Sequence, residues 1–325
     1  MKIQQLVFPD QHRCEVEETE LSERLGPGEV LVKNRVTLVS AGTELAMFTR
    51  THRGFDEPDF AYAKYPFRPG YAAVGEVVIG VGDIKPGTRV FHATKHGTYA
   101  KLSAQDVIVL PEGLADEHAT FFGLAQISMT SPRLAPPKMG EHVVVIGMGL
   151  IGNLCAQLYA QGGAGRVGCA DLTPFRLEKA RACGLIEGFN TREKPLTEWV
   201  KQFGPRGAEI VVEAVGINPT IDAALKSVAD RGLVVLLGSP RSKMEIDPYF
   251  DIHRKGIAVI GAHGRNVDAV TRQQDQPLLL EWLKNGKLRV EPLITQRMPF
   301  TEGLKAYEGL RDRTDEYLGV ILTYP

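Results

Sequence analysis

The residues best suited to chemistry lie in a glycine-rich stretch between residues 143 and 171. Four apolar residues that favour β-structure run into Gly147-Met148-Gly149-Leu150-Ile151-Gly152, and an apolar helical pattern follows from Leu150. A strand, tight turn and helix in this order bring backbone N–H groups and the positive end of a helix dipole to a pyrophosphate. The pattern therefore predicts a dinucleotide-binding site.

Each glycine of this motif has its own expected task. Gly147 allows the sharp turn, Gly149 lets the backbone approach the pyrophosphate, and Gly152 lets the helix pack close to the strand. Asp171 ends the next short strand, where a carboxylate accepts hydrogen bonds from ribose hydroxyls and repels a 2′-phosphate, so NAD is the predicted cofactor. Arg176 keeps a smaller option for NADP open. The residues expected to bind the cofactor belong to the motif or follow later strands: Gly147, Met148, Gly149, Leu150, Ile151, Gly152, Asp171, Arg176, Ala214, Gly238 and His263, the last with helix capping as its alternative interpretation.

Composition limits the class of protein. The chain has 325 residues, enough for about two domains, with 43% apolar and 24% charged residues and a net charge of −1. This balance predicts no basic patch for nucleic acid or an anionic membrane. No apolar run approaches the roughly 18 residues of a membrane span, and the first residues lack a signal-peptide core, so we predict a cytoplasmic protein. The four scattered cysteines indicate neither a disulfide framework nor a zinc cluster.

The first part of the chain predicts a small β-rich domain, because glycine and proline turns separate short strands. A loop-rich stretch, 41–70, interrupts these strands and begins with a short helix after Gly42, and loops on a rigid scaffold often hold functional sites. The expected strands are 2–8, 29–38, 72–79, 88–92, 98–102 and 107–110.

From residue 117 the pattern alternates between helix and strand, which predicts a parallel sheet covered on both faces. A terminal strand after a complete sheet most simply rejoins the first domain. The expected helices are 117–133, 175–183, 197–203, 219–229, 278–284 and 302–310. The expected strands are 143–146, 167–170, 208–214, 233–237, 257–261, 288–297 and 317–322.

Several stretches together resemble the medium-chain dehydrogenase/reductase superfamily, which includes the zinc alcohol and polyol dehydrogenases. They are the glycine motif, GPGEVLVKNRVTLVSAGTEL, PGYAAVGEVVIGVGDIKPGTRV, FRLEKARACG, VVEAVG and KGIAVIGAHG. The resemblance covers essentially the whole chain and implies an α/β fold with two parts and an active site in the cleft. Residues 1–122 and 289–325 would form a GroES-like β-barrel catalytic domain, and residues 123–288 a Rossmann domain with a doubly wound parallel sheet that binds NAD.

The zinc ligands that the resemblance implies are missing from the sequence. The ligand cysteine before a Gly-Thr/Ser-Asp triplet is Ala41 here, Gly70-Tyr71-Ala72 replaces Gly-His-Glu, and the third ligand position falls on Phe121-Phe122. The four-cysteine lobe of a structural zinc is also missing. Because zinc needs at least three N, S or O ligands, we predict a zinc-independent protein.

Without zinc, another group must take the proton from an alcohol or stabilise an oxyanion. The resemblance implies that Thr43 contacts the substrate oxygen. Tyr71 replaces a ligand, but its pKa would have to fall or a cation such as Lys95 would have to assist. Each candidate also has a purely structural interpretation. Tyr71 could fill the space of the missing metal, Lys95 and His96 could be solvated turn residues, and Glu44 could form an ion pair with Arg68. The candidates for handling the proton are Tyr71, Lys95, His96 and Glu44.

We therefore predict a zinc-independent NAD(H)-dependent oxidoreductase that interconverts a secondary alcohol and a ketone on a sugar, polyol or cyclitol. The SAGTE and PGYAAVGEV segments also resemble the bacteriochlorophyllide dehydrogenase branch, whose hydroxyethyl-bearing ring would need a wide apolar cleft. Two further alternatives are a zinc-free enoyl or quinone reductase, against which Asp171 argues, and a protein that binds NAD without turnover. The resemblance also implies that strand 257–261 pairs with its counterpart in a second subunit, so we expect a homodimer or homotetramer.

Overall fold

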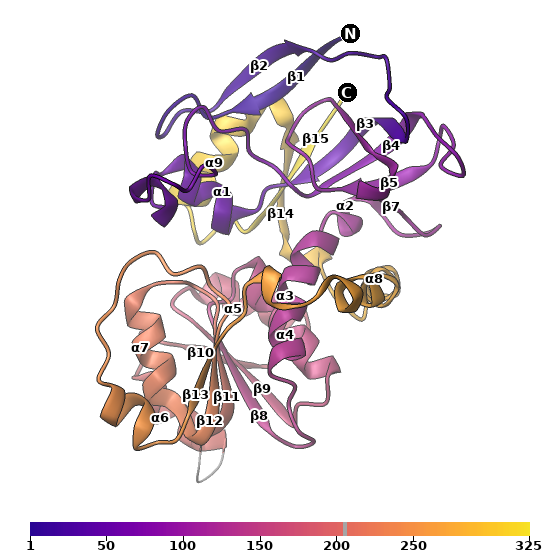
Figure 1. Cartoon of the computed structure of the whole chain (residues 1–325). Coiled ribbons are helices and arrows are strands. Elements are labelled where there is room, and N and C mark those ends of the chain that lie inside the picture. The colour runs from indigo at the N-terminus through magenta and orange to yellow at the C-terminus, as the bar shows by residue number, and fades with distance from the viewer. Residues whose placement is uncertain (204–206) are drawn as a thin grey trace. The chain divides into compact units, whose positions relative to one another are not determined.

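The protein divides into two compact units, each with its own sheet (Figure 1). The structure is a computed structural model that describes residues 1–203 and 207–325. Unit 1 comprises Met1–Gly123 and Leu280–Pro325, and unit 2 comprises Leu124–Leu279. The chain thus returns to unit 1 at Leu280, earlier than the predicted residue 289. Among the described residues, none of the helices has the length and apolar character that a membrane span requires.

Unit 2 is built around a parallel sheet of six strands in the order β10-β9-β8-β11-β12-β13. The first strand lies in the middle, the next two follow on one side and the last three on the other, which is the doubly wound order. This predicted feature is confirmed. The strands are β8 His142–Ile146, β9 Arg166–Asp171, β10 Glu187–Asn190, β11 Ala208–Glu213, β12 Val228–Leu236 and β13 Ala258–Gly261.

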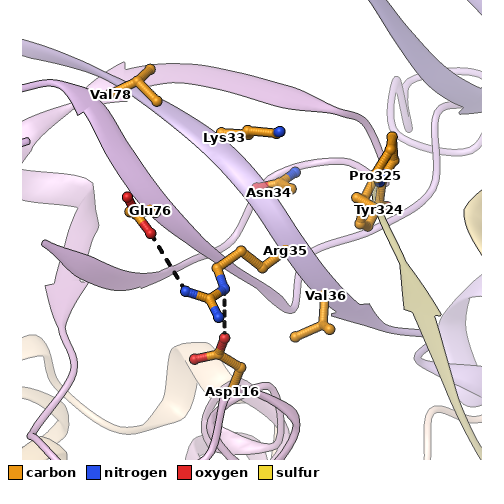
Figure 2. A pocket seen from close by; sticks show the side chains of 9 residues that line it. All are labelled: Lys33, Asn34, Arg35, Val36, Glu76, Val78, Asp116, Tyr324 and Pro325. Atoms are coloured by element: carbon orange, nitrogen blue, oxygen red, sulfur yellow. Dashed lines mark hydrogen bonds and ion pairs between the residues drawn. The ribbon is translucent and has the colours of Figure 1, made fainter. Parts of the chain in front are cut away.

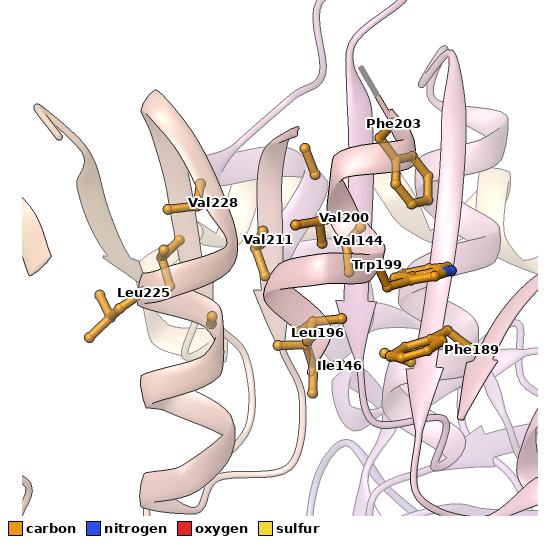
Figure 3. Close-up of a cluster of buried hydrophobic side chains, with 14 of the residues drawn as sticks. Val144, Ile146, Phe189, Leu196, Trp199, Val200, Phe203, Val211, Leu225 and Val228 are labelled. Carbon is orange, nitrogen blue, oxygen red and sulfur yellow. The ribbon is translucent and has the colours of Figure 1, made fainter. Parts of the chain in front are cut away.

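Alternate residues of these strands pack on opposite faces of the sheet, as the two-residue period of a strand requires. Val144 of β8 joins a buried cluster with Trp199 and Phe203 (Figure 3), whereas Val145 joins a second cluster with Tyr159. Burial on both faces explains why β8 is apolar at successive positions. The helices along this part of the chain are α3 Phe122–Leu134, α4 Leu150–Gln161, α5 Pro174–Ala182, α6 Leu196–Trp199, α7 Asn218–Ser227 and α8 Ala269–Lys284.

Unit 1 holds a mixed sheet of seven strands and a separate hairpin formed by β1 and β2. The sheet follows the order β14-β15-β3-β4-β5-β7, and β6 also pairs with β3. Because β15 pairs antiparallel with β3, the predicted return of the last strand to the first strands is confirmed. The strands are β1 Lys2–Val7, β2 Glu15–Glu20, β3 Glu29–Leu38, β4 Ala73–Ile79, β5 Arg89–His92, β6 Tyr99–Ser103, β7 Val107–Val109, β14 Ile294–Pro299 and β15 Gly319–Thr323. The helices are α1 Ala41–Phe48, α2 Asp116–Ala119 and α9 Gly303–Asp312.

Some elements differ from the sequence-based expectations. The prediction started α8 at residue 278, but the helix begins at Ala269 and contains Pro277. The extended segment expected from residue 288 contains a 3-10 turn, Glu291–Leu293, before β14 begins. The single helix expected at 117–133 is two helices, α2 and α3, and the strands β2 and β10 were not predicted.

Candidate active site

The glycine motif forms a tight turn between β8 and α4. Gly147 has a φ of +94°, which residues with a side chain rarely adopt. A Cβ at Gly152 would lie 1.8 Å from the carbonyl oxygen of Gly147, so only glycine allows the helix to lie this close. Gly149 is the N-cap of α4, and a Cβ there would meet no atom within 4 Å. The turn therefore leaves open space at the helix N-terminus, which fits the pyrophosphate of a dinucleotide.

Asp171, at the end of β9, is held by backbone N–H groups. Its Oδ2 accepts a hydrogen bond from Met148 N–H at 2.7 Å, and its Oδ1 accepts one from Thr173 N–H at 2.8 Å. Arg176 Nη1 lies 4.0 Å from Oδ2. The carboxylate thus ties the glycine turn to the second strand, and each oxygen keeps further acceptor capacity for a ribose hydroxyl.

A second turn, after β11, lies against the glycine motif. A Cβ at Gly152 would lie 3.2 Å from Ala214 Cβ, and a Cβ at Gly238 would lie 2.5 Å from Gly216 N. The fully buried Glu213 holds this turn, because its Oε1 accepts hydrogen bonds from backbone N–H groups of the turn, including that of Gly216. Ala214 and Gly238 thus lie at this turn beside the motif. The sequence analysis did not predict that Glu213 holds the turn.

His263 acts as a cap. It precedes the 3-10 turn Gly264–Asn266, and its Nδ1 accepts a hydrogen bond from Arg265 N–H at 3.2 Å. The capping interpretation of His263 is therefore confirmed.

Three hydroxyl groups lie together at the start of helix α1 in unit 1, those of Ser40, Thr43 and Tyr71. The Tyr71 hydroxyl forms a short hydrogen bond with Ser40 Oγ. Burial raises the pKa of Tyr71 to about 12, and the charge of Glu44 acts in the same direction, whereas the hydrogen bonds from Ser40 and Thr43 act to lower it. This shift is opposite to the one that a tyrosine base would need. Tyr71 stays protonated at neutral pH, as an unperturbed phenol would, and it can give up its proton only to a stronger base such as an alkoxide.

Glu44 and His96 belong to a buried hydrogen-bond network. Glu44 Oε2 accepts a hydrogen bond from the Tyr307 hydroxyl at 2.5 Å and lies 3.0 Å from His96 Nε2. His96 Nδ1 lies 2.7 Å from Thr37 Oγ1, which in turn lies 3.0 Å from the Tyr324 hydroxyl. His96 is 0% and Glu44 1% exposed, so neither side chain reaches the surface. Sequence spacing offered no signal for Tyr307 or Tyr324 as partners.

The predicted pairing of Glu44 with Arg68 is wrong. Arg68 donates two hydrogen bonds of 2.9 Å to Glu17 instead. Lys95 is exposed, as a solvated residue would be, and its Nζ lies 5.8 Å from the centre of the Phe67 ring. Burial of its inner part lowers the pKa of Lys95, although the charge of Glu44 acts against this shift.

Apart from Tyr71, the positions at which the resemblance implies zinc ligands carry packed hydrocarbon side chains. Ala41 packs against the apolar cluster that contains Phe48, Ala72 is fully buried, and the Phe122 ring lies edge-on to Phe91 at 5.1 Å. These three side chains offer no N, O or S donor. Tyr71, which replaces the histidine of the Gly-His-Glu motif, offers one phenol oxygen, so the residues supply fewer than the three donors that a zinc ion needs. Within residues 1–203 and 207–325, no three His, Cys, Asp or Glu side chains lie close enough together to hold a metal.

A hollow of about 510 Å³ in unit 1 lies apart from the predicted site residues, none of which lines it (Figure 2). Arg35 crosses it and pairs with Asp116 at 2.8 Å and with Glu76 at 3.4 Å. Tyr324 also lines the hollow, so the outer end of the buried network lies at its wall.

Comparison with known proteins gives both sequence and structural similarities. Residues 151–285 match the model of the zinc-binding dehydrogenase family. Over 234 residues, 72% of this chain, the protein is 27% identical to the L-threonine 3-dehydrogenases of Yersinia pestis (strain Pestoides F) and Pectobacterium atrosepticum. The match covers 64% and 61% of the length of these two relatives.

Solved structures of similar fold cover almost the entire chain. Galactitol-1-phosphate dehydrogenase from Escherichia coli superposes with a TM-score of 0.84 at 20% identity, covering 99% of this chain and 100% of that one. L-idonate 5-dehydrogenase from Escherichia coli superposes with a TM-score of 0.85 at 18% identity, covering 100% and 99%. The 2R,3R-butanediol dehydrogenase from Bacillus subtilis gives 0.84 at 19% identity, covering 99% and 100%. The fold is therefore that of the medium-chain dehydrogenases, and the matched segment supports a relationship with the zinc-binding dehydrogenase family.

Proposed function

We propose that the protein is a zinc-independent NAD(H)-dependent oxidoreductase that interconverts a secondary alcohol and a ketone, with a sugar, polyol or cyclitol as its substrate. The observation that carries this proposal is the hydrogen bond between the hydroxyl groups of Tyr71 and Ser40, at a position where the resemblance implies a zinc ligand. The names of the similar proteins, which include threonine, galactitol-1-phosphate, butanediol and idonate dehydrogenases, support an alcohol substrate.

Different residues of this chain would bind the cofactor, bind the substrate and transfer the proton. A bound nicotinamide supplies the hydride acceptor or donor. The glycine turn and Asp171 bind the cofactor, and Thr43 holds the substrate oxygen. Tyr71 donates its proton to that oxygen during reduction, because its pKa of about 12 keeps it protonated. Oxidation returns a proton to the phenolate, so we expect oxidation to be faster at alkaline pH.

Kinetics of two variants test the proposal. Thr43→Ala and Tyr71→Phe should each lower kcat/KM by about 10²- to 10⁴-fold, the contribution of a positioned acid or base, while NAD affinity changes by only a few-fold. Tyr249→Phe, at an exposed tyrosine of unit 2, is the matched control and should keep full activity. Elemental analysis of the wild-type protein should find no stoichiometric zinc. Full turnover by Tyr71→Phe, or one zinc per chain, would contradict the proposal.

A second candidate substrate is a hydroxyethyl group on a large ring. Phe60 and Tyr62 are each 46% exposed, and their ring centres lie 6.2 Å apart. Burial raises the pKa of Tyr62, and the charge of Glu44 acts in the same direction, so this aromatic pair lies within electrostatic range of Glu44. Measuring turnover of both substrate classes by the wild-type protein decides between them.

A further inference from the structure

Helix α1 begins with a serine that does not cap it. Ser40 occupies the N-cap position, where a serine oxygen ordinarily accepts a hydrogen bond from a backbone N–H of the first turn. Its hydroxyl makes no capping bond and instead bonds the Tyr71 hydroxyl. A residue type that is favoured at N-caps therefore has a different task here.

Glu44 takes over part of the capping. Its Oε1 accepts a hydrogen bond from the Ser40 backbone N–H at 3.0 Å, and its own N–H donates to the Ser40 carbonyl at 3.0 Å. This resembles the acidic half of a capping box, in which a glutamate side chain reaches back to the N-cap N–H. One residue thus fixes both backbone polar groups of Ser40.

The Glu44 carboxylate is itself fixed from two other segments of unit 1. The Tyr307 hydroxyl on α9 and His96, which precedes β6, both lie within hydrogen-bond distance of Oε2. A buried carboxylate that would lose these partners by moving has a strongly preferred position, because the loss of each bond is costly away from water. The position of Ser40 follows from that of Glu44.

We propose that Ser40 is a positioning residue for Tyr71, and that Glu44 holds the Ser40 backbone so that the Ser40 hydroxyl stays directed at Tyr71. This inference rests on the proposed function, in which Tyr71 donates its proton to the substrate oxygen. A phenol O–H can rotate about its C–O bond, and a fixed hydroxyl partner restricts that rotation. Besides Ser40 and Thr43, the groups that influence Tyr71 are the carboxylate of Glu44 and the phenol of Tyr62.

The test combines kinetics with ¹³C NMR of protein labelled at tyrosine Cζ, a carbon whose signal responds to hydrogen bonding of the phenol. The Tyr71 signal is identified by its loss in Tyr71→Phe. Ser40→Ala should shift this signal and lower kcat/KM by up to about 100-fold, the effect of a small misplacement, with NAD affinity unchanged. Ser40→Thr, which keeps the hydroxyl, should restore both. Glu44→Gln should also shift the signal, because it removes the charge and one of the acceptor oxygens.

Ser103 provides the matched control. It is an N-cap serine of the same unit that does cap, since its hydroxyl accepts a hydrogen bond from Gln105 N–H at 3.2 Å. Ser103→Ala should leave the Tyr71 signal and kcat/KM unchanged. If Ser40→Ala does not fold, Ser40→Gly replaces it, because glycine is tolerated at N-caps.

Two results would overturn the inference. One is a Tyr71 signal that stays in place when the Ser40 hydroxyl is removed. The other is a Ser40→Ala variant that keeps wild-type kcat/KM although Tyr71→Phe is inactive. A wild-type protein that turns over no alcohol would overturn the proposed function instead, and the NMR signal would still decide whether Ser40 holds Tyr71.

Discussion

Tyr71 shows how the partners of a side chain decide its chemistry. An unperturbed phenol has a pKa near ~10, and burial raises that of Tyr71 to about 12 despite two hydrogen bonds that act against the shift. The folded protein therefore keeps this phenol protonated at neutral pH, whereas a tyrosine base would need the opposite environment.

His92 should make stability depend on pH. Burial lowers the pKa of His92 to about 4, whereas the unfolded chain has a value near ~6.5. Between these values the unfolded state binds the proton and the folded state does not. The free energy of unfolding should therefore rise by up to about 3 kcal/mol from pH 4 to pH 6.5 and level off above that range.

Denaturant unfolding of a variant measures this contribution. His92→Gln should flatten the pH dependence between pH 4 and 6.5, whereas His253→Gln, at an exposed histidine, should leave it as in the wild type. An unchanged slope in His92→Gln would show that other groups cause the pH dependence.

Asp171 should determine the choice between NAD and NADP. Its carboxylate offers acceptors to ribose hydroxyls and repels a 2′-phosphate, so NAD should bind more tightly by roughly 1–3 kcal/mol. Asp171→Ser should narrow this difference in a binding titration, and Asp222→Ser, at a partly exposed aspartate of α7 that pairs with Lys226, should not. Equal or tighter binding of NADPH by the wild-type protein would refute the assignment.

Some residues of the candidate site could be predicted from the sequence, and others could not. Asp171 and the glycines follow from local spacing, because their partners are neighbours along the chain or in the next strand. Ser40 and Tyr307 were missed, because their partners Tyr71 and Glu44 lie 31 and 263 residues away and no periodicity connects them. Contacts of this kind depend on how the sheet of unit 1 brings distant segments together.

At the scale of elements, two glycines of the turn between β8 and α4 should serve different purposes. Gly152 allows close packing of the helix, and Gly149 leaves space for a ligand. Gly152→Ala should destabilise the protein by more than about 3 kcal/mol, because its Cβ would clash with the backbone of Gly147. Gly149→Ala should change stability by less than about 1 kcal/mol, since a Cβ there meets open space.

Binding distinguishes the two positions further. Gly149→Ala should weaken NAD binding by about tenfold or more, because the new methyl group would occupy the space predicted for the pyrophosphate. Calorimetric titration with thermal unfolding of the same samples measures both quantities. A folded Gly149→Ala variant with wild-type NAD affinity would remove this turn from the cofactor site.

The elements that the sequence did not predict have identifiable physical reasons. The strand β2 has the sequence EVEETE, which lacks an apolar face because the strand lies in an exposed hairpin. The helix α8 contains Pro277, a residue that usually marks the first turn of a helix, so its true start at Ala269 was hidden. The strand β8, buried on both faces, was predicted because its apolar run is continuous.

At the scale of the whole molecule, β13 should form a subunit contact. It is the edge strand of the sheet in unit 2, it is largely exposed, and Val259 is 40% exposed. An apolar edge strand favours pairing with another chain, so we expect a homodimer or homotetramer. Light scattering that gives 35.6 kDa at micromolar concentration would contradict this expectation.

A charged residue placed on the edge strand β13 tests the same expectation about the oligomeric state. Val259→Lys should shift the protein toward the monomer, since charged residues on edge strands prevent pairing. Val270→Lys, at a residue of α8 that is 64% exposed, should not change the oligomeric state.

The hydrogen bonds of the Glu44 carboxylate also bear on the order in which the two units fold during synthesis. Unit 2 is one continuous segment, whereas unit 1 also needs β14, α9 and β15, which are made after unit 2. Until Tyr307 has been made, Glu44 lacks one of its donors, and burying it would leave an under-compensated charge. We therefore expect the nascent chain to complete its second unit before its first, although most strands of the first unit are made earlier.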